Sequence, residues 1–138
     1  RWPHVIIVMV FSAGVAGYFT FKMVDSPSVG ASGGIMGLLG FLLVFELLHK
    51  KLVPKPTRRR LIAGVVVTAL MGVLGFHFID NAAHLGGLVA GMVYAGAIFP
   101  PSKSPHRPRI MKQDRLIAVL AGAVIVLGLG IVLVKLVG

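Results

Sequence analysis

Gly30-Ala31-Ser32-Gly33 opens a hydrophobic block that runs on to His49, and Asn81-Ala82-Ala83-His84-Leu85-Gly86-Gly87 opens another that runs on to Phe99. Each stretch combines small residues with one side chain of a kind used in nucleophilic catalysis, a serine hydroxyl in the first and a histidine imidazole in the second. One further hydrophobic block separates them. If all three blocks cross a membrane, the two side chains lie at the same depth near the same face. Their separation of 84 − 32 = 52 residues corresponds to two spans, so the chain crosses the membrane and returns between them.

The composition of the 138-residue chain indicates an integral membrane protein. Charged residues make up only 13% and hydrophobic residues 57%, whereas a soluble domain carries roughly a quarter charged residues. Mean hydropathy is +0.93, and the apolar residues occur in long blocks instead of the stripes of an amphipathic helix. The alternating pattern of a membrane β-barrel is absent, so we predict an all-α fold, a polytopic transmembrane helical bundle.

Five hydrophobic blocks predict five spans in this chain, each about 18–22 residues long and sufficient for a hydrocarbon core of roughly 30 Å. The predicted spans cover residues 5–24, 31–49, 61–79, 82–99 and 116–137. The chain is accordingly divided into core helices over residues 1–99, a basic cytoplasmic linker over 100–115, and an additional C-terminal transmembrane helix over 116–138.

Positive charge predicts the orientation of these spans. The connecting stretch 50–60 carries six Lys or Arg residues and the stretch 101–115 carries five, whereas the connections at 25–30 and 80–81 carry none. Because short basic loops stay on the cytoplasmic side, the first two are predicted inside and the other two outside. Span parity agrees, since two helices separate the basic loops. Orientation in the lipid bilayer thus accounts for the net charge of +10, and no nucleic-acid partner is predicted.

The chain begins at Arg1 and enters a hydrophobic span without the small-residue cleavage pattern of a signal peptide. We therefore expect that an N-terminal part of the natural protein precedes it. Cysteine is absent, which excludes disulfides, thiolate catalysis and thiolate metal sites within this chain. No two histidines or carboxylates have a spacing that predicts a metal site, and no cofactor is predicted.

Small residues recur at every fourth position beside both polar side chains. In the block that begins near Ser32, Gly33 and Gly37 share one helix face. In the block that contains His84, the small stripe consists of Ala83, Gly87, Gly91 and Ala95. Such stripes let helices approach closely in lipid, and close approach is predicted to bring the hydroxyl and the imidazole within hydrogen-bond reach. Packing alone also explains the glycines, and a serine in a transmembrane helix usually bonds a backbone carbonyl.

Four other polar side chains are weaker candidates. His77 either faces the site or the membrane interface, and His49 is predicted at the cytoplasmic boundary. Glu46 is expected to pair with a nearby Lys or Arg. Asp80 lies four residues before His84 and has two equally supported interpretations, as a group that orients the imidazole or as a helix cap.

The two motifs and their separation by one helix resemble the rhomboid family of intramembrane serine proteases. The residues that carry the resemblance are Gly30-Ala31-Ser32-Gly33, Gly37-Leu38-Leu39-Gly40, Ala83-His84, Gly87 and Gly91. It covers essentially residues 1–99, where it implies the third to sixth helices of a six-helix core. A seventh helix at 116–137 follows, and the first two helices of the same protein are then missing partners of this chain.

The resemblance implies an intramembrane serine endopeptidase that cleaves transmembrane segments of membrane proteins near the extracytoplasmic face, in the plasma (inner) membrane. Ser32 would attack the scissile carbonyl, and His84 would accept its proton and return it to the leaving amine. Ser32 is at a helix N-terminus, whose free N–H groups suit an oxyanion. Gly30, Ala31 and Gly33 would contact the oxyanion and the substrate backbone.

The chain departs from the family pattern in two places. Rhomboids usually supply further oxyanion donors, a histidine and an asparagine, from their second helix, which this chain does not include. Some members place an aromatic residue one turn after the serine, where this chain has Met36. By the same resemblance, the outer end of the third span, residues 75–79, is a lateral route for the substrate.

Two other functions use the same sequence features. A catalytically inactive relative that binds membrane proteins requires neither Ser32 nor His84, so the presence of both argues against it. A small membrane transporter component predicts more intramembrane carboxylates, or a broken helix aimed at the midplane, and the sequence contains neither pattern.

Overall fold

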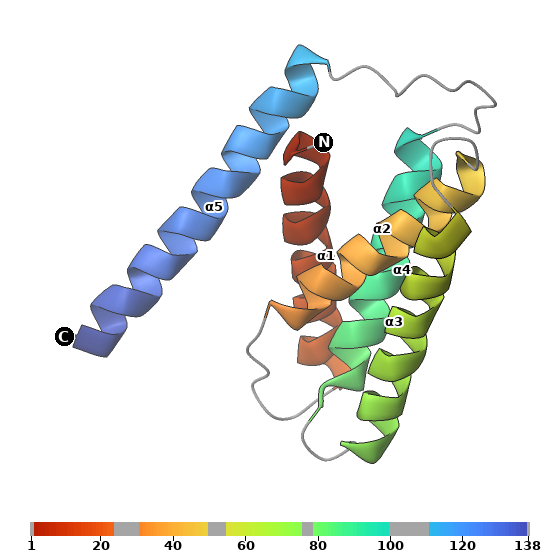
Figure 1. Ribbon diagram of the computed structural model, residues 1–138. Coiled ribbons are helices and arrows are strands. Elements are labelled where there is room, and N and C mark those ends of the chain that lie inside the picture. The colour runs from red at the N-terminus through yellow and green to blue at the C-terminus, as the bar shows by residue number, and fades with distance from the viewer. Residues whose placement is uncertain (1, 24–30, 50–54, 76–78, 100–110, 138) are drawn as a thin grey trace.

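The computed structural model describes residues 2–23, 31–49, 55–75, 79–99 and 111–137, and over these residues it consists of five α-helices. The helices are α1 (Trp2–Met23), α2 (Ser32–Leu48), α3 (Lys55–Leu74), α4 (Asn81–Ile98) and α5 (Lys112–Val137). Successive helices run in alternating directions, so the starts of α2 and α4 lie toward the same end of the bundle (Figure 1). The predicted all-α class is confirmed.

Within the described residues, two helices are both long and apolar enough to cross a membrane by length and composition. They are Trp2–Lys22, with 21 residues, and Asn81–Ile98, with 18. Helix α2 is apolar but shorter, at 17 residues, and α3 begins with charged residues. Large apolar side chains cover the outside of the bundle, with an exposed fraction of 83% at both Phe21 and Leu74. Such a surface suits lipid, because exposing it to water costs about 25 cal/mol per Å².

Helices α1, α2 and α4 form the centre of the bundle, because each of them packs against the other two. Helix α3 packs against α2, and α5 packs against α1. Figure 1 shows α5 close to α1 near its own N-terminal end and diverging from the bundle toward its C-terminal end.

The crossing of α2 and α4 is a backbone contact along the stripes of small residues. A Cβ atom at Gly87 would clash with the carbonyl oxygen of Gly33, and one at Gly91 would clash with the carbonyl oxygen of Gly37. Glycine is required at these positions because any larger residue would separate the two helices. The segments that follow Ser32 and His84 are therefore held together over more than one helical turn.

The other end of the bundle is filled with aromatic side chains. Phe41 and Phe99 belong to the buried core there, and the ring of His49 stacks on Phe45 with a centroid distance of 4.4 Å. His49 is 1% exposed, so packing accounts for this histidine. The predicted pairing of Glu46 is confirmed: its Oε2 lies 3.8 Å from Nε of Arg58.

Two helices begin earlier than predicted. Helix α3 begins at Lys55, so the arginines at 58–60, predicted in a connecting stretch, are helical. Pro56 permits this because the first turn of a helix needs no partner for its N–H groups, and arginine is a good helix former. Helix α5 begins at Lys112 instead of residue 116. The predicted linker over residues 100–110 and the connection at 25–30 lie outside the described residues.

Candidate active site

Ser32 is the first residue of α2, and its side chain is exposed. Ala31 occupies the N-cap position and makes no side-chain hydrogen bond to the helix. The first backbone bond that closes the turn runs from the N–H of Ile35 to the carbonyl of Ala31, at 3.0 Å. Among the described residues, no side chain caps the N–H groups of the turn that begins at Ser32. These groups carry the positive end of the helix dipole.

His84 is in the first turn of α4 and is half-buried. Its ring atom Nδ1 is buried and has no hydrogen-bond partner among the residues that the structure describes. Oγ of Ser12, Oε2 of Glu46 and Nε2 of His49 share this property among the described residues, so the missing partner does not by itself distinguish His84 from structural residues. The backbone N–H of His84 donates to the carbonyl of Asp80 at 3.1 Å, so the helix holds the main chain while the imidazole nitrogen has no fixed partner.

The fold brings Ser32 and His84 to the same end of the α2–α4 crossing. A Cβ atom at Gly33, the residue after Ser32, would lie 3.4 Å from the carbonyl oxygen of Ala83, the residue before His84. Between these two described side chains the structure contains no hydrogen bond, so their direct contact stays a prediction. In ligand-free enzymes, bonds between catalytic groups are often long and tighten only when substrate binds.

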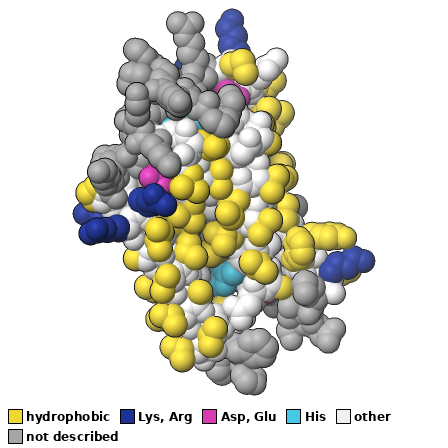
Figure 2. Space-filling model, turned by 90° about the vertical axis from the view of Figure 1, so that its right-hand side faces the viewer, with side chains coloured by type: hydrophobic (Ala, Val, Ile, Leu, Met, Phe, Trp, Pro, Cys, Tyr) yellow, Lys and Arg dark blue, Asp and Glu magenta, His cyan; other side chains and the backbone are white. Residues whose placement is uncertain are grey.

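An open, mostly apolar groove of about 630 Å³ lies between α2, α3 and α4. His84 lines it together with Met36 from α2 and Thr68 from α3, whereas Ser32 is not among its lining residues. Figure 2 shows a histidine side chain recessed among the hydrophobic side chains of this face. His84 therefore borders an apolar groove, and Met36, one turn after Ser32, is on its wall.

Asn81, one turn before His84, joins α4 to α3. Its Nδ2 donates to the carbonyl of Gly72 at 3.0 Å, and Asn81 also lines the groove. The sequence does not predict this role of Asn81, because no pattern in α3 identifies Gly72 as its partner.

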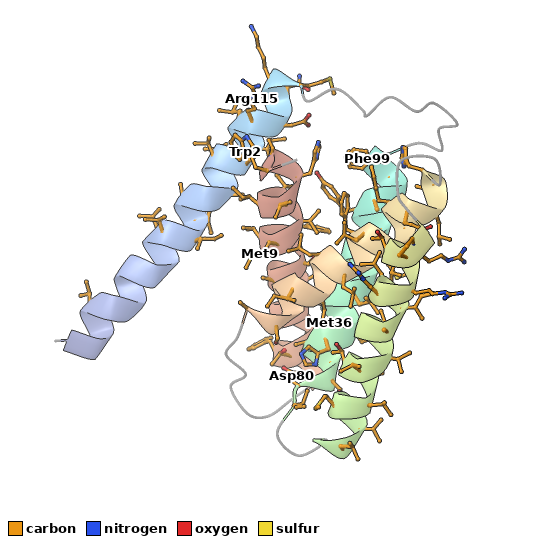
Figure 3. All side chains as sticks on the ribbon, in the orientation of Figure 1. Trp2, Met9, Met36, Asp80, Phe99 and Arg115 are labelled. Carbon is orange, nitrogen blue, oxygen red and sulfur yellow. The ribbon has the colours of Figure 1, made fainter. Side chains whose placement is uncertain are left out.

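Asp80 is the N-cap of α4. Its Oδ1 accepts from the N–H of Ala83 at 2.8 Å, and its Oδ2 accepts from the hydroxyl of Thr20 in α1 at 2.5 Å. The capping interpretation is thus confirmed, and Thr20 is an additional residue near the site. Figure 3 shows Asp80 and Met36 in the same region of the bundle, away from Phe99.

The remaining predicted residues divide into two groups. Gly33 is buried between α1 and α4, and Ala31 is exposed. Gly30 and His77 lie outside the described residues, so their predicted roles stay predictions.

Over the part of the chain that the structure describes, no three histidine or carboxylate side chains gather as a metal site would require.

Comparison with known proteins gives consistent matches. The rhomboid domain matches residues 3–101. The chain is 32% identical to Rhomboid protease GluP of Bacillus subtilis (strain 168) over 121 residues, which cover 84% of this chain and 23% of the relative. It is 32% identical to RHOMBOID-like protein 9, chloroplastic, of Arabidopsis thaliana over 84 residues, covering 59% of this chain and 19% of the relative.

A third relative, Rhomboid-like protease 5 of Toxoplasma gondii, is 33% identical over 72 residues, which cover 51% of this chain and 9% of the relative. The chain thus spans less than a quarter of the length of each of these curated relatives. No solved structure matches it significantly. The domain match extends over α1 to α4, and on this evidence the chain belongs to the rhomboid family of integral, multi-pass membrane proteins.

Proposed function

We propose that this chain carries the catalytic dyad of an intramembrane serine endopeptidase that cleaves transmembrane segments of membrane proteins. The observation that carries the proposal is the approach of Gly33 to Ala83, which holds the start of α2 at Ser32 beside the turn that contains His84. The names of two relatives, Rhomboid protease GluP and Rhomboid-like protease 5, support proteolysis.

The reaction follows from the chemistry of these groups. Oγ of Ser32 attacks the scissile carbonyl carbon while His84 accepts the hydroxyl proton. The carbonyl oxygen becomes an oxyanion, and the N–H groups at the start of α2 stabilise it, with contacts from Ala31 and Gly33 and from Gly30 before them. The C–N bond breaks when His84 returns the proton to the leaving amine. Water then attacks the acyl-enzyme with His84 as base, which releases the new carboxylate and restores the serine.

The groove beside His84 supports an apolar substrate. Its walls are formed mainly by aliphatic side chains of α2, α3 and α4, so a transmembrane segment can lie there without exposing its backbone to lipid. We propose that the five helices are five spans, with the basic ends of α3 and α5 in the cytoplasm and Ser32 near the extracytoplasmic face of the plasma (inner) membrane. Further helices of the same protein would complete the site.

A second candidate is a catalytically inactive relative that binds membrane proteins. The observation in its favour is that the described side chains of Ser32 and His84 are not hydrogen-bonded to each other. Binding alone, however, requires neither the hydroxyl of Ser32 nor the imidazole of His84, and the chain has both.

The test is cleavage of a single-span reporter protein by the full-length protein in lipid vesicles. Ser32→Ala and His84→Asn are each expected to lower cleavage by on the order of 10⁴-fold or more, since nucleophile and base act as a unit. Ser12→Ala is the matched control, because the Ser12 hydroxyl is buried in α1 without a hydrogen-bond partner. Wild-type cleavage by Ser32→Ala would reject the proposal.

A further inference from the structure

The hydrogen bond between Thr20 and Asp80 joins α1 to the first turn of the helix that carries His84. Thr20 is 7% exposed, and its Oγ1 lies 2.5 Å from Oδ2 of Asp80 and 3.1 Å from the carbonyl oxygen of Ala16. A hydroxyl has one proton. The carboxylate is the shorter and stronger acceptor, so the proton belongs mainly to the bond with Asp80.

The two oxygens of Asp80 have separate tasks. Oδ1 caps α4 by accepting from the N–H of Ala83, which is sufficient to begin the helix. Oδ2 is not needed for the cap, and it bonds Thr20 on another helix. The carboxylate is half-buried, and both donors, together with the positive end of the α4 dipole, offset the cost of removing its charge from water.

The same face of α1 also contacts the helix that carries Ser32. Ala16 is one turn before Thr20, and its side chain occupies the position where a Cβ of Gly33 would lie. Residues four apart on a helix share a face. One turn of α1 therefore contacts the residue after Ser32 and the cap four residues before His84.

We propose that the Thr20–Asp80 hydrogen bond is a positioning device that fixes the distance between the hydroxyl of Ser32 and the ring of His84. Helix α1 is the common reference: Ala16 positions the start of α2, and Thr20 positions the start of α4 through Asp80. A displacement of the first turn of α4 moves the imidazole with it. Substrate binding is expected to change less, because residues of α2 and α3 also line the groove. This inference rests on the proposed function, and Thr20 and Asp80 are positioning residues that need not touch the substrate.

The experiment uses the full-length protein in vesicles and two substitutions that remove the bond in different ways. Thr20→Val keeps the shape of the side chain and removes the donor. Asp80→Ser keeps a capping oxygen and removes the second acceptor. Each is expected to lower kcat for a single-span reporter by about 10- to 100-fold with KM unchanged, because a misplacement of about 1 Å in a catalytic group has effects of this size.

The double variant and a rescue variant separate positioning from general damage. Thr20→Val with Asp80→Ser is expected to be no slower than either single variant, since both remove the same bond. Thr20→Ser restores the hydroxyl and is expected to recover most of kcat. Reaction of Ser32 with a fluorophosphonate probe, measured per folded molecule, is expected to slow by the same factor as kcat.

The same measurements of cleavage and probe labelling separate a failure of the inference from a failure of the proposed function. If wild-type protein neither cleaves the reporter nor reacts with the probe at Ser32, the proposed function is wrong and the inference falls with it. Wild-type protein that cleaves the reporter and reacts with the probe at Ser32 supports the proposed function. If Thr20→Val or Asp80→Ser then keeps the kcat and the probe reactivity of the wild type, only the inference is overturned. It is also overturned if the losses of the two single variants multiply in the double variant.

Discussion

At the residue scale, the environment of His84 combines a fixed backbone with an unpaired ring nitrogen. The first turn of α4 is held by Asp80 and Asn81, which bond α1 and α3 respectively, whereas Nδ1 of His84 is buried and has no partner. Two neighbouring helices therefore fix the main chain before His84, while Nδ1 makes no hydrogen bond to a described residue that would restrict the ring.

Asn81→Ala tests how firmly α3 is attached to this turn. Loss of the bond to the carbonyl of Gly72 is expected to lower the free energy of unfolding by about 1 kcal/mol. Thr68→Val is the matched control, because the Thr68 hydroxyl bonds Gly64 within α3 and joins no second helix. Thermal unfolding in detergent compares the two variants, and an equal or smaller effect of Asn81→Ala would contradict the bridging role.

The sequence singles out individual side chains but does not specify their partners. Ser32 and His84 could be selected because each stands beside small residues at the start of a hydrophobic block. Thr20 could not be selected, since its role depends on a contact with a residue 60 positions later in the chain. From the sequence alone Asp80 has two interpretations, because a sequence does not specify which donors surround a carboxylate.

At the element scale, the close crossing of α2 and α4 determines the geometry of the site. Both helices could be placed from the sequence because their small-residue stripes have the spacing of one helix face. The earlier start of α3 could not, because proline and clustered arginines suggest a loop but are also compatible with a first helical turn.

Gly91→Ala is expected to weaken this crossing. The added Cβ would clash with the carbonyl of Gly37, and overpacking of this kind costs about 1–3 kcal/mol. Gly96→Ala is the matched control in the same helix, since a Cβ there has nothing within 4 Å. Thermal stability and reporter cleavage should both be lower for Gly91→Ala than for Gly96→Ala, which has the same gain in helix propensity without the clash. Equal behaviour of the two variants would show that the backbone contact is unimportant.

At the scale of the whole molecule, alternating helix direction and the positions of basic residues predict one orientation in the membrane. The α3 start carries Arg58, Arg59 and Arg60, all exposed, at the end of the bundle opposite the start of α4 (Figure 1). The course of α5 was not predictable, because its apolar residues lie on all sides and specify no partner face. Its contact with α1 includes Asp114, whose Oδ2 lies 3.7 Å from Nε2 of His4.

Single cysteines test this orientation, since the chain has none of its own. Lys22→Cys, at the end of α1, is expected to react with a membrane-impermeant maleimide added to intact cells. Gln113→Cys, at the start of α5, is expected to react only after permeabilisation, because basic connections stay in the cytoplasm. Both side chains are exposed, so burial does not limit the reaction. The reverse pattern would place Ser32 on the cytoplasmic side.

The most direct measurement of the central claim is the position of a fluorophosphonate adduct on the folded, full-length protein, determined by mass spectrometry of its peptides. Activation of Ser32 by His84 predicts an adduct on Ser32 that disappears in His84→Asn and after denaturation. An adduct on a different serine, or equal labelling of Ser32 when His84 is replaced, would contradict a dyad formed by these two residues.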